Sequence, residues 1–363
     1  MNNPFLIEYN TPHKTVPFDK ISISDYEPAI RKGMEEEDNE IKNIVDNKDC
    51  PTFENTILAL EKSGKLLDRV TTVFFNIMSA ETNDELDAIA EKLMPELSEH
   101  SNNISLNPIL FEKIKSVYLD RDSLNLTKEE YRLLEKTYDG FIRNGANLNE
   151  EDKRKFRKLS TDLSSLTLKF SQNHLKETNK YELHITEKEN LAGLPESAVE
   201  AAMHTAKMKG KDGWIFTLQA PSYIPFMKYS DKRELRKNMY MAYNTQCIHG
   251  DEFDNVEIVK QLVNTRMELA NILGFKDYAD YVLQKRMAEN SERVYNLLNQ
   301  LIDAYTPTAL EEIKDIENLA KKLEGEDFVL MPWDFSYYAE KLKNEKYNLD
   351  EETLRPYFEL KNV

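Results

Sequence analysis

Apolar residues repeated at helical spacing restrict the fold of this chain more than any other feature. The segment from 156 to 170 shows the pattern, with apolar residues three or four positions apart at Phe156, Leu159, Leu163, Leu166 and Phe170. That spacing places the side chains on one side of an α-helix, whereas a half-buried strand needs a period of two. Comparable segments fill most of the chain, and only 10 of its 363 residues are Gly. We therefore predict a mainly α-helical fold.

Two threonines mark expected helix starts. Thr82 is followed by Glu85, and Thr127 by Glu130. At this spacing a threonine hydroxyl and a glutamate carboxylate satisfy the free backbone N–H groups of a first helical turn. We expect Pro95 to kink or end the first of these helices, because proline lacks the N–H that an interior helix position donates.

A third helix is expected to begin at Thr52 and to extend to about Met78. Gly64 falls in a gap on its apolar side, where the missing side chain would allow close contact with another helix. The apolar residues on that side are Phe53, Ile57, Leu60, Leu67, Val70 and Phe74.

The clearest interruption is the stretch RNGANLNEED at 143–152. Gly145 suits the end of one helix, and Asn149 followed by three acidic residues suits the start of the next. We therefore expect two parts on either side of this break. Residues 1–148 would form an N-terminal arm and a helical lobe segment. Residues 149–363 would hold a long helix, a small β element and further helices.

Two regions lack a helical pattern. In residues 1–25, NPFL and VPFD each place Pro before Phe, which suggests an extended arm laid on the body of the protein. Strand-like sequence occurs only near 180–228, in YELHIT and GWIFTLQ, and we expect the following PSYIPFMKY to be extended. The fold class predicted is mainly α with one small β element.

Charge and hydropathy exclude several classes of function. The chain has 48 Lys and Arg against 65 Asp and Glu, a formal net charge of −17, which disfavours binding to nucleic acid or anionic lipid. No apolar run reaches the roughly 18 residues of a membrane-spanning helix, and MNNPFLIEYN lacks the features of a signal peptide. We expect no nucleic-acid partner, no membrane insertion and a cytoplasmic location, with the periplasm after signal removal as the alternative.

The two cysteines, Cys50 and Cys247, are too few and too far apart for a disulfide framework. Cys247 lies two residues before His249, and a thiol beside an imidazole is one arrangement of a nucleophilic site. Side chains only two residues apart rarely face each other in the geometry that a nucleophile and its base need. We therefore interpret both cysteines as ordinary free thiols.

No motif for metal or nucleotide chemistry is present. The pattern His-Glu-x-x-His, in which two imidazoles on one helix face hold zinc and the glutamate acts as base, does not occur. Neither does a Cys pair at zinc spacing, a P-loop, G-x-G-x-x-G or G-x-S-x-G. We assign no catalytic, cofactor-binding or metal-binding residue. The six histidines are scattered: His13, His100, His174, His184, His204 and His249.

The stretch MPWDFSYY at 331–338 concentrates aromatic rings near the end of the sequence. Trp333 and Tyr338 have polar tips that need partners when buried, and Asp334 is an available acceptor. A ring in a binding wall and a ring in a core look alike in sequence, so both alternatives stay open, with packing preferred.

Several long segments together resemble the peptidyl-dipeptidase (dipeptidyl carboxypeptidase) branch of the thimet oligopeptidase family. They are NPFL at 3–6, FENTILALEKSGKLLDRVTTVFF at 53–75, TNDEL at 82–86, LGFKDYADYVLQKRMA at 273–288 and PWDFSYYAEKLKNEKYNLDEETLRPYFELKNV at 332–363. The similarity extends from the first residues to the last.

This resemblance implies a nearly all-helical zinc metallopeptidase in which two lobes flank a narrow channel, and which removes C-terminal dipeptides from oligopeptides. In the family, His-Glu-x-x-His and a glutamate ligand lie downstream of the YFEL segment, whereas this chain stops at Val363. The resemblance therefore implies an N-terminal part that forms channel wall and restricts substrate size. Its partner would be the catalytic half, and alone it would bind no zinc and be inactive.

The alternative is a non-catalytic helical binding or scaffold protein, which the missing zinc motif favours. A reading frame that continues past Val363 into His-Glu-x-x-His would exclude this alternative. Under the family interpretation, we expect Trp333, Asp334, Tyr337 and Tyr338 to anchor the junction with the catalytic half. Faces that pack on that half would be exposed in this chain, so we also expect self-association or marginal stability.

Overall fold

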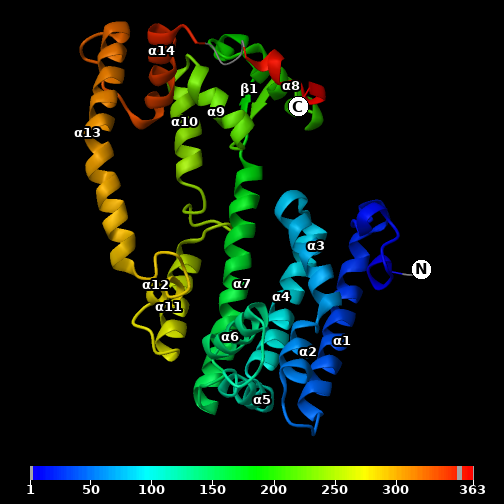
Figure 1. The fold of residues 1–363 in the computed structure, drawn as a ribbon. Coiled ribbons are helices and arrows are strands. Elements are labelled where there is room, and N and C mark those ends of the chain that lie inside the picture. The colour runs from blue at the N-terminus through cyan, green and yellow to red at the C-terminus, as the bar shows by residue number, and fades with distance from the viewer. Residues whose placement is uncertain (1–2, 350–353, 363) are drawn as a thin grey trace. The chain divides into compact units, whose positions relative to one another are not determined.

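The computed structural model of the chain describes residues 3–349 and 354–362, and helices dominate it (Figure 1). The prediction of a mainly α fold with one small β element is confirmed. In chain order the helices are α1 (Tyr26–Asp46), α2 (Ala59–Glu61), α3 (Lys65–Glu81), α4 (Asp84–Ser105), α5 (Pro108–Leu119), α6 (Lys128–Arg143), α7 (Glu150–Lys180), α8 (Glu196–Met208), α9 (Ala220–Tyr229), α10 (Arg233–Asn244), α11 (Val256–Ile272), α12 (Tyr278–Leu283), α13 (Ser291–Glu324) and α14 (Phe335–Tyr347).

The chain divides into two compact units. Unit 1 comprises Met1–Lys169 and Val259–Val282, and unit 2 comprises Phe170–Ile258 and Leu283–Val363. The boundary passes through α7, a helix of 31 residues. The division expected between residues 148 and 149 stays a prediction.

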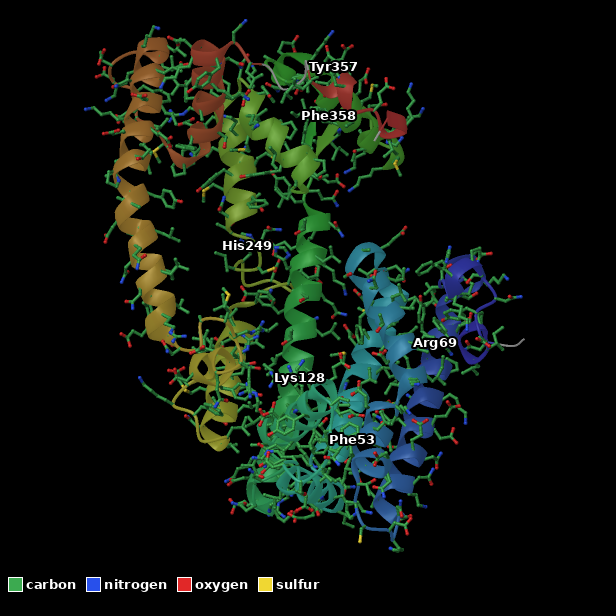
Figure 2. The ribbon with its side chains drawn as sticks, viewed as in Figure 1. Phe53, Arg69, Lys128, His249, Tyr357 and Phe358 are labelled. Carbon is green, nitrogen blue, oxygen red and sulfur yellow. The ribbon has the colours of Figure 1, made fainter. Side chains whose placement is uncertain are left out.

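Unit 1 has three apolar cores among its described residues, and the smallest joins Leu106, Phe156 of α7 and Leu269 of α11. In the first, Phe53 (labelled in Figure 2) and Ile57 pack with apolar residues of α1, α5 and α6. In the second, Phe5 of the N-terminal arm packs fully buried with Tyr26 of α1 and Phe74 of α3. The arm is not extended throughout as expected, because it contains four short 3₁₀ turns, and the first, Pro4–Leu6, carries the buried Phe5.

Unit 2 is built around the two strands. β1 (Leu183–Ile185) and β2 (Trp214–Phe216) pair antiparallel, with His184 opposite Ile215. Apolar side chains of the strands, α8, α9 and α10 form one core, against which Trp333 packs. A smaller core joins α13 to α14 through Ile316, Ala320, Tyr337 and Tyr338.

The prediction of one continuous helix from Thr52 to about Met78 is wrong. Thr52 caps a π-helical turn at Phe53–Leu58, which leads into α2, and α3 begins only at Lys65. Gly64 separates them in a left-handed conformation, with φ of 68°, which glycine adopts without the strain that a Cβ brings. The close contact expected at Gly64 is with a side chain: a Cβ there would lie 2.5 Å from Glu37 Oε1.

The capping predictions have mixed outcomes. Thr127 and Glu130 form the expected capping box at the start of α6. The start expected at Thr82 is wrong by one residue, because the Asn83 side chain accepts from Glu85 N and Leu86 N instead. Asparagine is at least as good a cap as threonine. α4 also continues through Pro95 to Ser105.

The segment PSYIPFMKY is helical, as α9, and the prediction of extended chain is wrong. Pro221 lies in the first turn of α9, where the backbone N–H that proline lacks has no helical partner in any case. Phe226 and Met227 are buried in the core of unit 2. That burial outweighs the hydrogen bond lost at Pro225 inside the helix.

Candidate functional site

A cluster of polar side chains in unit 2 surrounds Asp334. This residue ends the 3₁₀ turn Pro332–Asp334 that leads into α14. Arg233 and Arg236 lie three residues apart on α10 and therefore point to the same side of that helix. Arg233 Nη2 donates to Asp334 Oδ2 (2.6 Å), and Arg236 Nη2 donates to Asp334 Oδ1 (2.9 Å). Asp334 and Arg236 are 0% and 1% exposed, so the pair is fully withdrawn from water.

The other polar atoms of Arg236 and Asp334 also have partners. Arg236 Nη1 donates to Ser230 O (2.7 Å), and its Nε donates to Trp333 O (3.3 Å). Met331 N donates to Asp334 Oδ2 (3.1 Å), and the Arg236 guanidinium lies 4.0 Å from the centre of the Tyr337 ring. A carboxylate saturated in this way has no lone pair left for a substrate or a metal ion. Its chemistry is structural: it fastens α10 to the start of α14.

Two of the aromatic rings of the 331–338 stretch, Tyr337 and Tyr338, lie in the interior of unit 2, whereas Phe335 is 43% exposed. Tyr337 Oη donates to Asp231 Oδ1 (2.7 Å), and Tyr338 Oη donates to Glu324 Oε1 (3.0 Å). Burial, reinforced by these carboxylates, raises the pKa of both phenols well above the ordinary value. Asp334 was expected to accept from the ring tips, but it binds arginines instead. Tyr337 and Tyr338 are thus packed within unit 2, and the role of the stretch at a junction stays a prediction.

The segment between α10 and α11 is fastened to α7 through Glu177. Cys247 N donates to one carboxylate oxygen of Glu177, and His249 Nε2 (labelled in Figure 2) lies 3.1 Å from the other. Gln246 Nε2 donates to Thr178 Oγ1 (2.6 Å). Burial, together with the Glu177 carboxylate, raises the pKa of the Cys247 thiol to about 12. The thiol therefore stays protonated at neutral pH, which excludes it as an activated nucleophile.

The histidines do not form a metal site with other ligands in the part of the chain that the structure describes. Within residues 3–349 and 354–362, no group of three or more His, Cys, Asp or Glu side chains has the arrangement needed to hold a metal ion. His100 is bound to Glu37 and Asp38, and His184 lies 2.6 Å from the carbonyl of Asp212. These residues do not fit the tetrahedral ligand sets of zinc.

Unit 1 contains an open hollow of about 760 Å³ between α1, α3, α4 and α6. Glu37, His100, Ser101, Lys136 and Thr137 are among its lining residues. Acidic, basic and hydroxyl side chains are mixed there. Pockets for small organic ligands are mostly apolar with a few convergent polar groups. The lining therefore favours no single class of ligand.

Comparison with known proteins gives the chain a family. Residues 226–363, which contain the Asp334 cluster and all of α13, match Peptidase family M3. The whole chain is 37% identical over 362 residues to the dipeptidyl carboxypeptidase of Escherichia coli K12, covering 99% of this chain and 53% of that protein. The chain is similar to peptidase family M3. The family resemblance drawn from the sequence segments is thereby confirmed.

Two further relatives show how far this M3 similarity extends. Oligopeptidase A of Haemophilus influenzae is 32% identical over 362 residues, covering 99% of this chain and 52% of the relative. The organellar oligopeptidase A of Arabidopsis thaliana is 31% identical over 373 residues, covering 100% of this chain and 46% of the relative. This chain thus spans about half the length of the curated relatives that it matches.

Sequence reasoning missed the partners of Asp334 and Cys247. The signal for the first was present in DKRELRK, where two arginines three apart interrupt an amphipathic helix. Nothing in the sequence links Glu177 to residues 246–249, because that contact joins positions about 70 apart.

Among the described residues, no helix is both long and apolar enough to cross a membrane.

Proposed function

We propose that the whole protein is a zinc metallopeptidase that removes C-terminal dipeptides from oligopeptides, and that this chain forms part of the wall of its substrate channel. One observation carries the proposal: the 37% identity with a dipeptidyl carboxypeptidase across 99% of this chain. The lower identity with oligopeptidase A, 32% for the Haemophilus influenzae protein, supports the dipeptidase branch over the oligopeptidase branch.

In this proposal the chain contributes shape and support, and the zinc chemistry belongs to the half of the relatives that it does not match. The buried charged side chains of Asp334 and Arg236 are hydrogen-bonded to each other and to backbone groups, and are not available to a substrate. The polar groups around Cys247 hold a loop against α7. A rigid wall that excludes folded proteins from a channel needs such internal fastening more than it needs reactive groups.

The substrate class is tested with an amino-blocked tetrapeptide offered to the whole protein, with the products separated by chromatography. The expected result is release of the C-terminal dipeptide. Release of single amino acids, or of internal fragments from longer peptides only, would contradict the dipeptidase assignment. A blocked dipeptide serves as the uncleavable control.

This 363-residue chain by itself is proposed to cleave nothing and to hold no stoichiometric zinc. Metal analysis after dialysis, beside an assay of the same sample with the tetrapeptide, tests both parts. One tightly held zinc per chain, or dipeptide release that a chelator abolishes, would overturn this part of the proposal.

The proposed compartment is the cytoplasm, in agreement with two unpaired cysteines, Cys50 and Cys247. The net charge of −17 disfavours nucleic acid as a partner. Fractionation of producing cells tests the location, and recovery with the periplasmic fraction would contradict it.

A further inference from the structure

The N-terminal two thirds of α13 has an unusually apolar surface. From Val294 to Tyr305 the sequence is VYNLLNQLIDAY. At about 100° per residue, its apolar positions cover about half of the helix circumference. The other half consists of Asn296, Asn299, Gln300 and Asp303, of which only the last is charged. An amphipathic helix with so wide an apolar side normally packs that side against the rest of a protein.

The structure leaves this surface exposed. Leu297 and Ile302 are each 58% exposed, and Tyr305 is 67% exposed. α13 packs on α14 only through its C-terminal part, where Ile316 and Ala320 are buried. Figure 1 shows α14 beside that end of α13 alone. Contiguous apolar surface of this kind marks an interaction site.

We propose that residues 294–310 of α13 form the docking surface for the half of a family M3 polypeptide that this chain does not match. The inference rests on the proposed function, because it takes the two halves as one peptidase. The M3 match includes all of α13, while the chain covers only 53% of the dipeptidyl carboxypeptidase. The apolar side of α13 therefore lies within the region that matches the family, yet no other element of this chain covers it among the described residues.

A second copy of this chain fits the surface less well. Two identical helices pack along a narrow seam of about two positions in seven, flanked by charged residues that pair across it. The apolar arc of α13 is about half a circumference, and residues 294–302 carry no charge at all. Two copies would also bring together chains of net charge −17 each, which repel. Cover from several sides by one larger body suits the arc better.

The test is a single polypeptide in which this chain continues after Val363 with the part of the Escherichia coli dipeptidyl carboxypeptidase that follows its matching region. Hydrogen–deuterium exchange is followed in peptides covering 294–305, in the extended chain and in the 363-residue chain. The expected result is exchange slowed by about tenfold or more in the extended chain. Peptides covering 316–324, already packed on α14, serve as the internal reference.

A matched pair of double variants makes the test specific. Leu298→Glu with Ile302→Lys places a favourable ion pair on the apolar side of α13. Asn296→Glu with Gln300→Lys places the same pair on the polar side, so both preserve the helix and the net charge. Only the first is expected to abolish the protection of 294–305 in the extended chain. In the 363-residue chain, only the first is expected to reduce binding of an apolar dye, by about twofold or more.

Three results would overturn the docking surface. One is unchanged exchange at 294–305 in the extended chain. Another is equal behaviour of the two double variants in both exchange and dye binding. The third is a discrete dimer of the 363-residue chain at low salt that protects 294–305 as fully as the extended chain does, which would identify a second copy as the occupant. The proposed function fails separately, if the extended chain protects 294–305 but releases no dipeptide.

Discussion

At the scale of single residues, the buried ion pair of Asp334 and Arg236 is the contact whose loss we expect to lower the stability of the fold most. Bringing an ion pair into the interior costs solvation free energy that the partners recover only when every polar atom is bound. The five hydrogen bonds described above meet that condition. Removing one partner would leave the other charge buried without compensation.

We therefore expect Asp334→Asn to lower the free energy of unfolding by about 3 kcal/mol or more. Arg236, at 1% exposure, would keep its charge without a carboxylate. Urea unfolding followed by tryptophan fluorescence measures the change, since Trp333 lies next to the substituted residue. Glu234→Gln, at an exposed end of a loose pair with Lys237, is the control and should change the value by less than about 0.5 kcal/mol. Equal effects of the two substitutions would contradict the argument.

His100 makes the stability of unit 1 depend on pH. Its Nε2 lies 2.8 Å from Glu37 Oε2 and its Nδ1 lies 3.2 Å from Asp38 Oδ1. The hydrogen bond to Glu37 outweighs the opposing effect of burial and raises the pKa of His100 above the ordinary 6.5. A raised pKa means that the folded state holds the proton more tightly than the unfolded state does. The resulting stabilisation is full below the unfolded pKa and is lost as pH rises through the folded pKa.

The corresponding variant is His100→Gln, which keeps a polar side chain but cannot titrate. The difference in unfolding free energy between the unsubstituted chain and this variant should be larger at about pH 5.5 than at about pH 8.5. Urea unfolding at both pH values measures it. A difference that stays constant or grows with pH would contradict the raised pKa. His184→Gln, at an exposed strand position, is the control.

At the scale of elements, glycine positions decide how closely helices approach. A Cβ on Gly33 of α1 would lie 2.8 Å from the Cα of Leu67 in α3, a backbone atom that cannot give way cheaply. A Cβ on Gly140 of α6 would meet nothing within 4 Å. Both glycines lie inside helices, so the same substitution has opposite expected effects.

Gly33→Ala should lower the free energy of unfolding by about 1–3 kcal/mol, because it forces α1 and α3 apart. Gly140→Ala should raise it by about 0.5–1 kcal/mol, because alanine restricts the unfolded chain and favours helix. Thermal unfolding of the two variants in parallel measures both signs. Stabilisation by Gly33→Ala would show that the helices are less tightly packed than described.

Elements that depend on local chemistry are predictable from the sequence, and those that depend on distant partners are not. The capping box at Thr127 and the helix end at Gly145 involve neighbours in sequence, and both are found as expected. The helix at 220–229 depends on burying Phe226 in a core assembled from several elements. Its two prolines therefore misled the local prediction. The tie between Asp334 and α10 joins residues about 100 apart, beyond what local spacing reveals.

At the scale of the whole molecule, exposed apolar surface and net charge act against each other. The apolar side of α13 favours association of the isolated chain, whereas a net charge of −17 opposes it through repulsion. Salt screens the repulsion and leaves apolar contacts intact. Association held together by ion pairs would show the opposite response.

We expect the isolated chain to associate more strongly as sodium chloride rises from about 0.05 M to about 0.5 M. Sedimentation velocity at several protein concentrations measures the mass distribution at each salt level. The double variant with Leu298→Glu and Ile302→Lys should lose most of this response. A chain that stays strictly monomeric at every salt level and binds no apolar dye would contradict the expectation.

Each unit contains one cysteine, and the two thiols differ in their exposure to solvent. Cys50 is exposed and belongs to unit 1, whereas Cys247 is buried and belongs to unit 2. A thiol-specific reagent should modify the exposed Cys50 first and reach the buried Cys247 only when the segment around it opens. Alkylation of Cys247 in the native protein, timed by mass spectrometry, therefore measures how often that part of unit 2 opens. The natural thiol of Cys247 therefore reports the rate of local opening in unit 2, and no engineered label is needed.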